Sequence, residues 1–153
     1  MILQYYMVRD DVYPPSRANP SDAGLDLVYN PEAPEDEVIN VQPGESVLLQ
    51  TGCRFAIPHG YMMEIKNRSS WAAKRQLLVG ACVVDSGYDG EVFVNLHNIG
   101  SRPRTILKGD KIAQGVVVPV IAVRWVESKE SEIYDWYPIS MSDRGSGKLG
   151  STD

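Results

Sequence analysis

The sequence predicts an all-β domain, either a barrel or a sandwich, built from short strands. Ten prolines and thirteen glycines interrupt the 153-residue chain at short intervals. Between them lie runs rich in Val, Ile, Leu and Tyr that often alternate with polar residues. Such runs, bounded by turn signals, favour strands over amphipathic helices. Their regular spacing is typical of barrels and sandwiches.

The first expected element is a β-strand within residues 1–8. Further strands are expected at residues 47–50, 61–66, 77–84, 91–98 and 111–125. Turns containing Pro, Gly or Asp fall at residues 42–44, 57–60, 87–90 and 107–110. The one helical candidate is the segment 70–75, which begins with a serine that can cap a helix.

The chain length suits one domain with a sizeable core, and the composition changes near the C-terminus. From residue 140 onward the chain is dominated by Ser, Gly, Asp, Arg and Lys. Such a segment is expected to be a flexible arm. The expected organisation is therefore a β-domain over residues 1–139 and an arm over residues 140–153.

Charge and cysteine content exclude several classes of function. The formal net charge is −5 and the basic residues are scattered along the sequence, which argues against nucleic-acid binding and anionic membranes. Cys53 and Cys82 form no Cys-x-x-Cys motif, which fits a reducing compartment. The N-terminal run is too short for a membrane span and lacks the basic start of a signal peptide. We expect a cytoplasmic protein, in a host cell if the source is viral.

Candidate chemistry concentrates between residues 68 and 92. Arg68, Ser69 and Ser70 can all hydrogen-bond an oxyanion, although these three residues alone favour a serine cap beside a surface arginine. Asp85 follows an apolar run and is expected to end a buried strand. Tyr88 lies in the turn that follows. A charge at the end of an apolar strand needs a reason, and catalysis is a common one.

Asp26 and Gln114 are two more candidate site residues. Asp26 lies among small and apolar residues and could hold a metal through water, or simply stabilise a turn. Gln114 interrupts an apolar run, so its amide must be satisfied by backbone or by a ligand. The sequence alone leaves these alternatives open.

The terminal segment superficially resembles a phosphate-binding loop but is not a P-loop. Lys148 is followed by Leu149 rather than by Ser or Thr, and the chain ends before a helix could form. One interpretation is an arm that closes over a polyphosphate, and the other is a disordered tail.

The order of these motifs resembles the trimeric dUTPase family. The carrying segments are Ala-Gly-Leu-Asp-Leu at residues 23–27, Arg-Ser-Ser at 68–70, Val-Asp-Ser-Gly-Tyr-Asp-Gly-Glu at 84–91, Gly-Asp-Lys-Ile-Ala-Gln at 109–114 and the terminal Arg-Gly-Ser-Gly and Gly-Ser-Thr. The resemblance implies a jelly-roll-like β-barrel and a homotrimer that hydrolyses dUTP to dUMP and pyrophosphate with Mg²⁺. It also implies active sites shared between subunits, each closed by a C-terminal arm.

The resemblance assigns catalytic and phosphate-binding roles by position. Asp85 corresponds to the general base that activates water for in-line attack on the α-phosphorus. Ser69 corresponds to the residue at the oxygen bridging the α- and β-phosphates, and Gln114 is placed with it in the catalytic group. Arg68 and Ser70 correspond to phosphate ligands. Asp26 corresponds to a residue that orders waters around Mg²⁺.

The resemblance also implies how base, sugar and arm interact. Tyr88 corresponds to the ring under the deoxyribose that excludes a 2′-hydroxyl. A hairpin is implied to read the uracil edge, and its residues are Gly80, Ala81, Cys82, Val83 and Phe93. From the arm, Arg144 corresponds to the clamp on the γ-phosphate, and Leu149, Ser151 and Thr152 complete the closure.

The sequence departs from the family pattern at three of these positions. Lys148 and Leu149 stand where the arm usually carries Gly and a Phe that stacks on uracil. Stacking of a base on an aromatic ring contributes roughly 1–3 kcal/mol, so we expect uracil binding to be weaker by roughly ten-fold. Cys82 stands where the hairpin often has Gly.

Two alternative functions remain at this point. The related dCTP deaminase branch shares the barrel and the Arg-Ser-Ser motif but needs a glutamate on the strand after the turn. That strand, residues 93–98, reads Phe-Val-Asn-Leu-His-Asn and contains no glutamate. The second alternative is a nucleotide-sensing or protein-binding module that binds dUTP with poor turnover. Pyrophosphate release from dUTP would separate it from an enzyme.

Overall fold

The computed structural model describes residues 1–138 of the chain. It divides into two units, Met1–Ile121 and Ala122–Asp153. Every strand in the described residues lies in the first unit, whereas residues 122–138 contain one short 3₁₀ turn, η3 (Glu130–Glu132). The first unit therefore holds the folded core that positions the candidate site.

The first unit is built almost entirely of short strands. They are β1 (Gln4–Met7), β2 (Leu25–Val28), β3 (Val38–Val41), β4 (Ser46–Gln50), β5 (Cys53–Ala56), β6 (Tyr61–Lys66), β7 (Leu77–Val79), β8 (Val83–Asp85), β9 (Phe93–Asn98), β10 (Arg104–Leu107) and β11 (Lys111–Pro119). Two helical turns join them, η1 (Pro34–Asp36) and η2 (Trp71–Arg75). The prediction of an all-β fold is confirmed.

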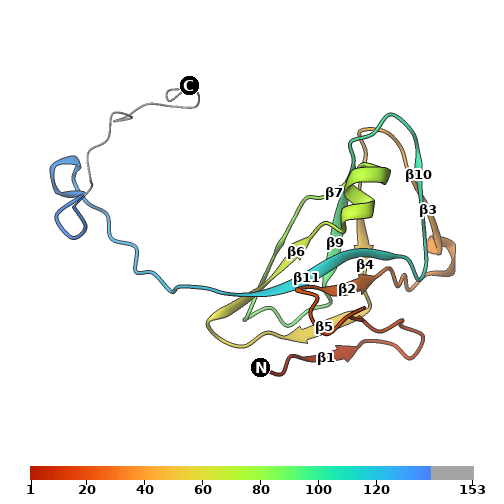
Figure 1. Ribbon diagram of the computed structural model, residues 1–153, viewed down its shortest axis with the longest axis horizontal. Coiled ribbons are helices and arrows are strands. Elements are labelled where there is room, and N and C mark those ends of the chain that lie inside the picture. The colour runs from red at the N-terminus through yellow and green to blue at the C-terminus, as the bar shows by residue number, and fades with distance from the viewer. Residues whose placement is uncertain (139–153) are drawn as a thin grey trace. The chain divides into compact units, whose positions relative to one another are not determined.

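The strands pair antiparallel in four sheets. The largest has the order β2-β11-β6-β8, and a second has the order β4-β9-β7. Two further pairs are β1-β5 and β10-β3. Figure 1 shows β11 lying between β2 and β6. Because β6 pairs with β11 on one side and β8 on the other, it connects segments that are far apart in the sequence.

Alternating side chains from the strands fill one core. In β9, Val94, Leu96 and Asn98 are buried, whereas Phe93 and His97 point to solvent. Met63 and Ile65 of β6 are buried as well. This alternation follows from the two-residue period of a strand and explains why the hydrophobic pattern located β6 and β9 correctly.

The predicted strand over residues 77–84 is wrong as a single element, because the chain changes sheets in its middle. The Gly80 amide donates to the Asn95 carbonyl of β9 at 2.9 Å, whereas the Cys82 carbonyl accepts from the Ile65 amide of β6 at 2.7 Å. Gly80 permits the crossing because a Cβ there would collide with the side chains of Asn95 and His97. The result is two strands, β7 and β8, in different sheets.

Two related expectations also require correction. Asp85 does end a strand, but that strand is not buried, since Val83 is 57% exposed and Asp85 is exposed. The hairpin expected to join residues 80–83 to Phe93 is not formed, because β8 pairs with β6 while β9 pairs with β4 and β7. The turn between them connects two sheets.

Other boundaries differ for local reasons. The strand expected at 111–125 ends at Pro119 in the structure, and proline cannot donate a further backbone hydrogen bond. β2, β3, β5 and β10 were not predicted, and each has only four residues. The helical segment was located correctly, but Ser70 makes no side-chain capping hydrogen bond.

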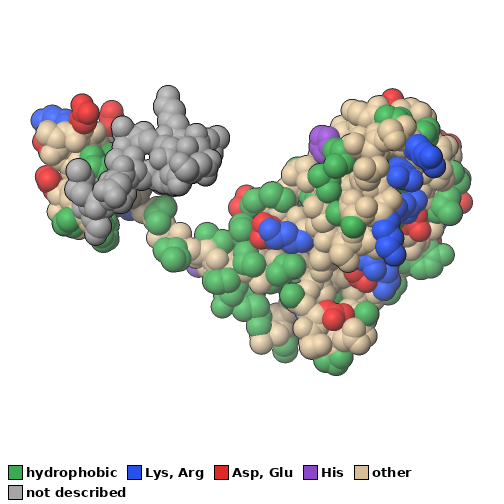
Figure 2. Space-filling model, turned by 45° about the horizontal axis from the view of Figure 1, so that its top comes forward, with side chains coloured by type: hydrophobic (Ala, Val, Ile, Leu, Met, Phe, Trp, Pro, Cys, Tyr) green, Lys and Arg blue, Asp and Glu red, His purple; other side chains and the backbone are tan. Residues whose placement is uncertain are grey.

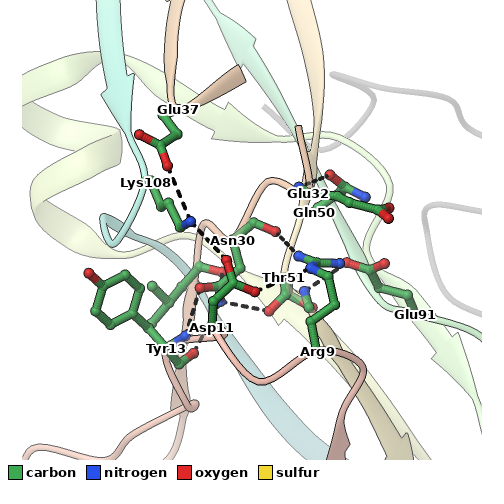
Figure 3. A network of polar contacts seen from close by, with 12 residues as sticks. Arg9, Asp11, Tyr13, Asn30, Glu32, Glu37, Gln50, Thr51, Glu91 and Lys108 are labelled. Carbon is green, nitrogen blue, oxygen red and sulfur yellow. Dashed lines mark hydrogen bonds and ion pairs between the residues drawn. The ribbon is translucent and has the colours of Figure 1, made fainter. Parts of the chain in front are cut away.

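The amide of Asn30 joins the N-terminal segment to the core (Figure 3). Its Oδ1 accepts from the Tyr13 amide at 2.8 Å, and its Nδ2 donates to the carbonyls of Tyr13 and Thr51 at 3.1 and 2.8 Å. The Asn30 carbonyl accepts from Arg9 at 2.7 Å. Asn30 is only 1% exposed, so water cannot replace these partners.

Replacing Asn30 with Leu should therefore destabilise the fold strongly. The variant leaves several buried backbone groups without partners, each costing about 1–3 kcal/mol, so we expect the free energy of unfolding to fall by about 3 kcal/mol or more. Urea denaturation measures this loss. The control is Asn40→Ala, because Asn40 is exposed and bonds only the Thr105 hydroxyl. Equal, small losses in both variants would contradict the role of Asn30.

Candidate active site

A hollow of about 240 Å³ lies where β8, β9 and the turn between them approach β4. Its lining residues are Leu48, Ala81, Val83, Val84, Asp85, Tyr88, Val92 and Phe93. The wall is mostly apolar, with one carboxylate and one phenol. This combination can hold a flat, partly apolar ring and place an acid beside it.

The turn after β8 holds Tyr88 beside Asp85. The Tyr88 amide donates to the Asp85 carbonyl at 3.1 Å, and the Tyr88 hydroxyl donates to the Glu91 carbonyl at 2.8 Å. Asp85 is exposed, so its charged form keeps access to water. A carboxylate of this kind can accept a proton from a water molecule that attacks a bound substrate.

A second cluster of polar residues surrounds Asp26. One carboxylate oxygen lies 2.9 Å from Nε of Arg68, and the other lies 3.1 Å from Nζ of Lys111. Arg68 also donates to the Lys111 carbonyl at 2.9 Å. Gln114, paired with Asp26 across β11 and β2, donates its amide to the Asn67 carbonyl at 2.9 Å. The cluster offers two cations and one amide, which suits an anion.

Cationic side chains gather on part of the visible surface in Figure 2. Figure 2 shows Lys and Arg side chains gathered in a column on one face of the first unit. Arg68, Arg75, Lys108 and Lys111 each pair with a carboxylate within 4 Å. Several basic residues that are scattered in the sequence are therefore held in ion pairs.

The hollow and the Asp26 cluster lie toward opposite ends of β6. Asp85 is opposite Met62, whereas Gln114 is opposite Lys66, four positions further along the strand. At about 3.3 Å per residue and about 4.8 Å between strands, Asp85 and Gln114 are separated by roughly 16 Å. Short side chains and one bridging water cannot span that distance. Within one chain the structure does not bring these two predicted site residues together.

The remaining predicted residues divide between these regions. Ser69 and Ser70 are exposed directly after Arg68, at the start of η2. Gly80 and Cys82 lie in the segment that crosses between sheets, next to the hollow but outside its lining. Arg144, Leu149, Ser151 and Thr152, together with Lys148, lie outside the described residues.

The structure adds site residues that sequence reasoning missed. Lys111 pairs with Asp26, and Asn67 orients Gln114, so both belong to the anion cluster. Lys111 lies in the Gly-Asp-Lys-Ile-Ala-Gln segment, so the sequence motif could have identified it as a site residue. Gly24 was inside another quoted segment, and a Cβ there would collide with Oε1 of Gln114. The close approach of these strands could not be inferred from spacing.

Asp26 is the carboxylate through which this cluster could bind a divalent metal. Within residues 1–138 no three His, Cys, Asp or Glu side chains form a group that could hold a metal. Mg²⁺ commonly takes one or two carboxylates, several waters and substrate phosphates. Each oxygen of Asp26 has two lone pairs and one cationic partner, so it can still accept from a metal-bound water. The residues fit an indirect, water-mediated contact.

Cys53 belongs to the core rather than to a reactive site. Burial, together with the nearby Glu91 carboxylate, raises the pKa of its thiol to about 11 against the opposing effect of Arg9. A thiol with that pKa stays protonated at neutral pH and is a weak nucleophile. Both cysteines are free.

Comparison with known proteins identifies relatives across nearly the whole chain. The family model described as dUTPase matches residues 10–152. The deoxyuridine 5′-triphosphate nucleotidohydrolase of Anaplasma marginale (strain St. Maries) is 38% identical over 144 residues, 90% of this chain and 87% of that protein. The enzyme of the same name from Agrobacterium fabrum is 43% identical over 115 residues, 74% of this chain and 72% of that protein.

Solved structures share the fold. A variant dUTPase of Staphylococcus bacteriophage 80alpha, with dUpNHpp, matches with a TM-score of 0.76 and 24% identity, covering 99% of this chain and 98% of that one. A variant dUTPase of phage phi11 of S. aureus, described with a structural Mg(II) ion, has a TM-score of 0.72 and 24% identity, covering 86% and 99%.

The mostly-β fold and these relatives define a nucleotide-hydrolysing enzyme. The chain belongs to the dUTPase family. In residues 1–138, no helix is both long and apolar enough to cross a membrane.

Proposed function

We propose that the protein hydrolyses dUTP to dUMP and pyrophosphate through attack of a water molecule on the α-phosphorus. Family membership supports hydrolysis of dUTP to dUMP. The hollow that brings Asp85 and Tyr88 together with Ala81, Val83 and Phe93 supports the finer assignment. Residues assigned to base, sugar and water meet in one place, and this observation carries the proposal.

Asp85 is the proposed general base. It ends β8 at the edge of the hollow, where its carboxylate reaches both solvent and a bound nucleotide. The reaction needs no protein nucleophile, because orienting a water and neutralising charge supply most of the rate. Asp85 accepts the proton of that water as the oxygen attacks phosphorus. The bond to the leaving pyrophosphate breaks in line with the attack.

The Asp26 cluster is the proposed phosphate site. Arg68 and Gln114 bind phosphate oxygens, Ser69 and Ser70 donate their hydroxyls, and Ser69 serves the bridging oxygen where charge develops. Lys111, whose ammonium lies beside Asp26, is a further proposed phosphate ligand. When a triphosphate arrives, the two cations can exchange the Asp26 carboxylate for phosphate oxygens at little electrostatic cost.

Mg²⁺ is the proposed cofactor, held through waters ordered by Asp26. The coordination of Mg(II) described for the phi11 protein supports the choice of metal. When bound, the ion would neutralise phosphate charge. The protein's own contribution is to keep one carboxylate, 16% exposed, next to two phosphate-binding cations.

The hollow is the proposed nucleoside site. Tyr88 packs under the deoxyribose and leaves no space for a 2′-hydroxyl. The backbone of the crossing segment, residues 80–83, reads the uracil edge, with Phe93 beside it. The two ends of this segment already bond β9 and β6 through Gly80 and Cys82, so its position is rigid. Rigid polar groups discriminate well between bases.

A homotrimer with shared active sites is the proposed assembly. A base must lie within hydrogen-bond reach of its water, so Asp85 has to approach the phosphates that Gln114 binds. Their separation of roughly 16 Å within one chain prevents this. The obstacle disappears when Asp85 of one copy faces the Asp26 cluster of another. Arg144, Leu149, Ser151 and Thr152 of the terminal arm, residues 140–153, would then close the site.

Substrate specificity is the direct test of this proposal. With Mg²⁺ present, pyrophosphate release is expected from dUTP and not from dCTP, dTTP or UTP, because the hollow is shaped for uracil and deoxyribose. All four nucleotides are assayed in parallel for pyrophosphate and for deamination. Formation of a deoxyuridine nucleotide and ammonia from dCTP would instead support the deaminase alternative. Binding of dUTP without release would support a sensor.

Replacing Asp85 with Asn should remove turnover and spare binding. The amide cannot accept the proton of the attacking water, so we expect kcat to fall by about 10²–10⁴. Affinity for a non-hydrolysable dUTP analogue should change little. The matched control is Asp89→Asn in the same turn, since Asp89 is 89% exposed and pairs with Arg54. If both variants keep near wild-type kcat, Asp85 is not the base.

Mixing two inactive variants tests whether sites are shared. Asp85→Asn and Arg68→Ala should each be inactive alone. In randomly mixed trimers, about a quarter of the sites combine an intact Asp85 from one copy with an intact Arg68 from another, and activity returns accordingly. Variants are refolded together and assayed against each refolded alone. No recovery, with mixed trimers verified by mass spectrometry, would show that each chain builds its own site.

A further inference from the structure

The ring of Tyr88 rests against Gly90, two residues further along the same turn. A Cβ on Gly90 would lie 2.5 Å from the Tyr88 hydroxyl oxygen and 2.6 Å from the ring carbon that bears it. Gly90 is not in the left-handed region of backbone conformation, so its φ angle does not demand glycine. The constraint comes instead from the Tyr88 side chain, because a Cβ at this position requires the ring to move.

Hydrogen bonds hold both the backbone and the side chain of Tyr88. The Tyr88 amide donates to the Asp85 carbonyl at 3.1 Å. The Tyr88 hydroxyl, at the tip of the ring, donates to the Glu91 carbonyl at 2.8 Å. The side chain remains 47% exposed and lines the hollow, so one face of the ring is available to a ligand.

The backbone beneath the ring is anchored to the core. The Glu91 carboxylate accepts from the Gly52 amide at 2.7 Å. The next residue, Val92, donates its amide to Cys53 at 2.9 Å and accepts from the Thr51 hydroxyl at 2.6 Å. Thr51 and Val92 are 1% and 2% exposed. Because these hydrogen bonds fix the backbone beneath the ring, the contact with Gly90 determines how far the Tyr88 ring lies above it.

We propose that Gly90 is a positioning residue for sugar selectivity, acting through Tyr88 to discriminate 2′-deoxyribonucleotides from ribonucleotides. The inference rests on the proposed function, in which the Tyr88 ring packs under the deoxyribose. A side chain at position 90 would displace the ring from its place under the sugar. A displaced ring no longer fills the space that a 2′-hydroxyl would need, so UTP is admitted and the preference for dUTP falls.

The test compares Gly90→Ala with Gly87→Ala, a matched change in the same turn. A Cβ on Gly87 meets nothing within 4 Å, and Gly87 is also outside the left-handed region. We measure kcat/KM for dUTP and for UTP with Mg²⁺. The dUTP:UTP ratio should fall by at least about ten-fold in Gly90→Ala, since a misplacement of about 1 Å can cost 10²-fold, and should stay unchanged in Gly87→Ala.

Two further variants separate the effect of the Tyr88–Gly90 contact from the effect of the ring itself. Tyr88→Phe keeps the ring on Gly90 but removes the bond to Glu91, so an intermediate loss of the ratio is expected even if Gly90→Ala fails to fold. Tyr88→Ala should abolish discrimination. Melting temperatures report whether each variant is folded.

Each result decides a different point. If Tyr88→Ala loses discrimination while a folded Gly90→Ala matches wild type, the positioning role of Gly90 is overturned and the proposed function stands. If Gly90→Ala does not fold, a wild-type ratio in Tyr88→Phe overturns it in the same way. If Tyr88→Ala still discriminates, the sugar contact of Tyr88 is wrong and the inference fails with it. If the wild-type protein releases no pyrophosphate from dUTP, the proposed function itself fails.

Discussion

The double pairing of β6 determines where Asp85 lies relative to the Asp26 cluster. This strand bonds β11 along one edge and β8 along the other, and its Met63 and Ile65 side chains are buried in the core. Its pairing with β11 sets the position of Gln114 and, through β2, of Asp26. Its pairing with β8 sets the position of Asp85. The β6–β11 register cannot slip without moving buried side chains to solvent. The position of β8, which has no buried residue, is fixed instead by the hydrogen bonds of Gly80 and Cys82 just before it.

This arrangement explains the mixture of burial and exposure in the site. The anchoring groups are inside: Thr51 and Val92 lie below the turn that carries Tyr88. The proposed reacting groups Asp85 and Ser69 are outside, where they are open to water and phosphates. A charged nucleophile or base is inexpensive at a surface, and its precision comes from rigid strands behind it. The exposed apolar residues Val83 and Phe93 complete the wall that a nucleoside would cover.

Much of the fold could be predicted from the sequence where hydrophobic alternation is regular. Residues 61–66 alternate clearly and form β6 with the predicted bounds. The prediction from alternation was wrong at Gly80, because the mostly apolar run from Leu77 to Val84 gives no indication of the change of sheet. That change depends on partners in β6 and β9, which are distant in the sequence. The four-residue strands such as β2 carry too little pattern to be recognised alone.

The order of the motifs in the sequence identified many candidate site residues, but it did not predict the distances between them in the fold. Ala81, Val83, Asp85, Tyr88 and Phe93 were all proposed from sequence, and the structure brings them to one hollow. The separation of Asp85 from Gln114 could not be predicted, since it depends on register along β6. Likewise, the pairing of Lys111 with Asp26 arises only when β11 meets β2. The contact between Tyr88 and Gly90 is a matter of side-chain direction that spacing does not reveal.

The sheet crossing at residues 80–82 has a consequence for how the chain can change in length. Only three residues of β8 pair with β6, and the crossing is bonded at Gly80 and at Cys82. A single inserted or deleted residue between Gly80 and Asp85 would turn Asp85 to the opposite face of its strand. The turn at Gly44, where the backbone is left-handed and a Cβ would meet no neighbour, carries no such constraint. Insertions and deletions compatible with activity are therefore expected in turns such as the one at Gly44. The segment from Gly80 to Asp85 must keep its length.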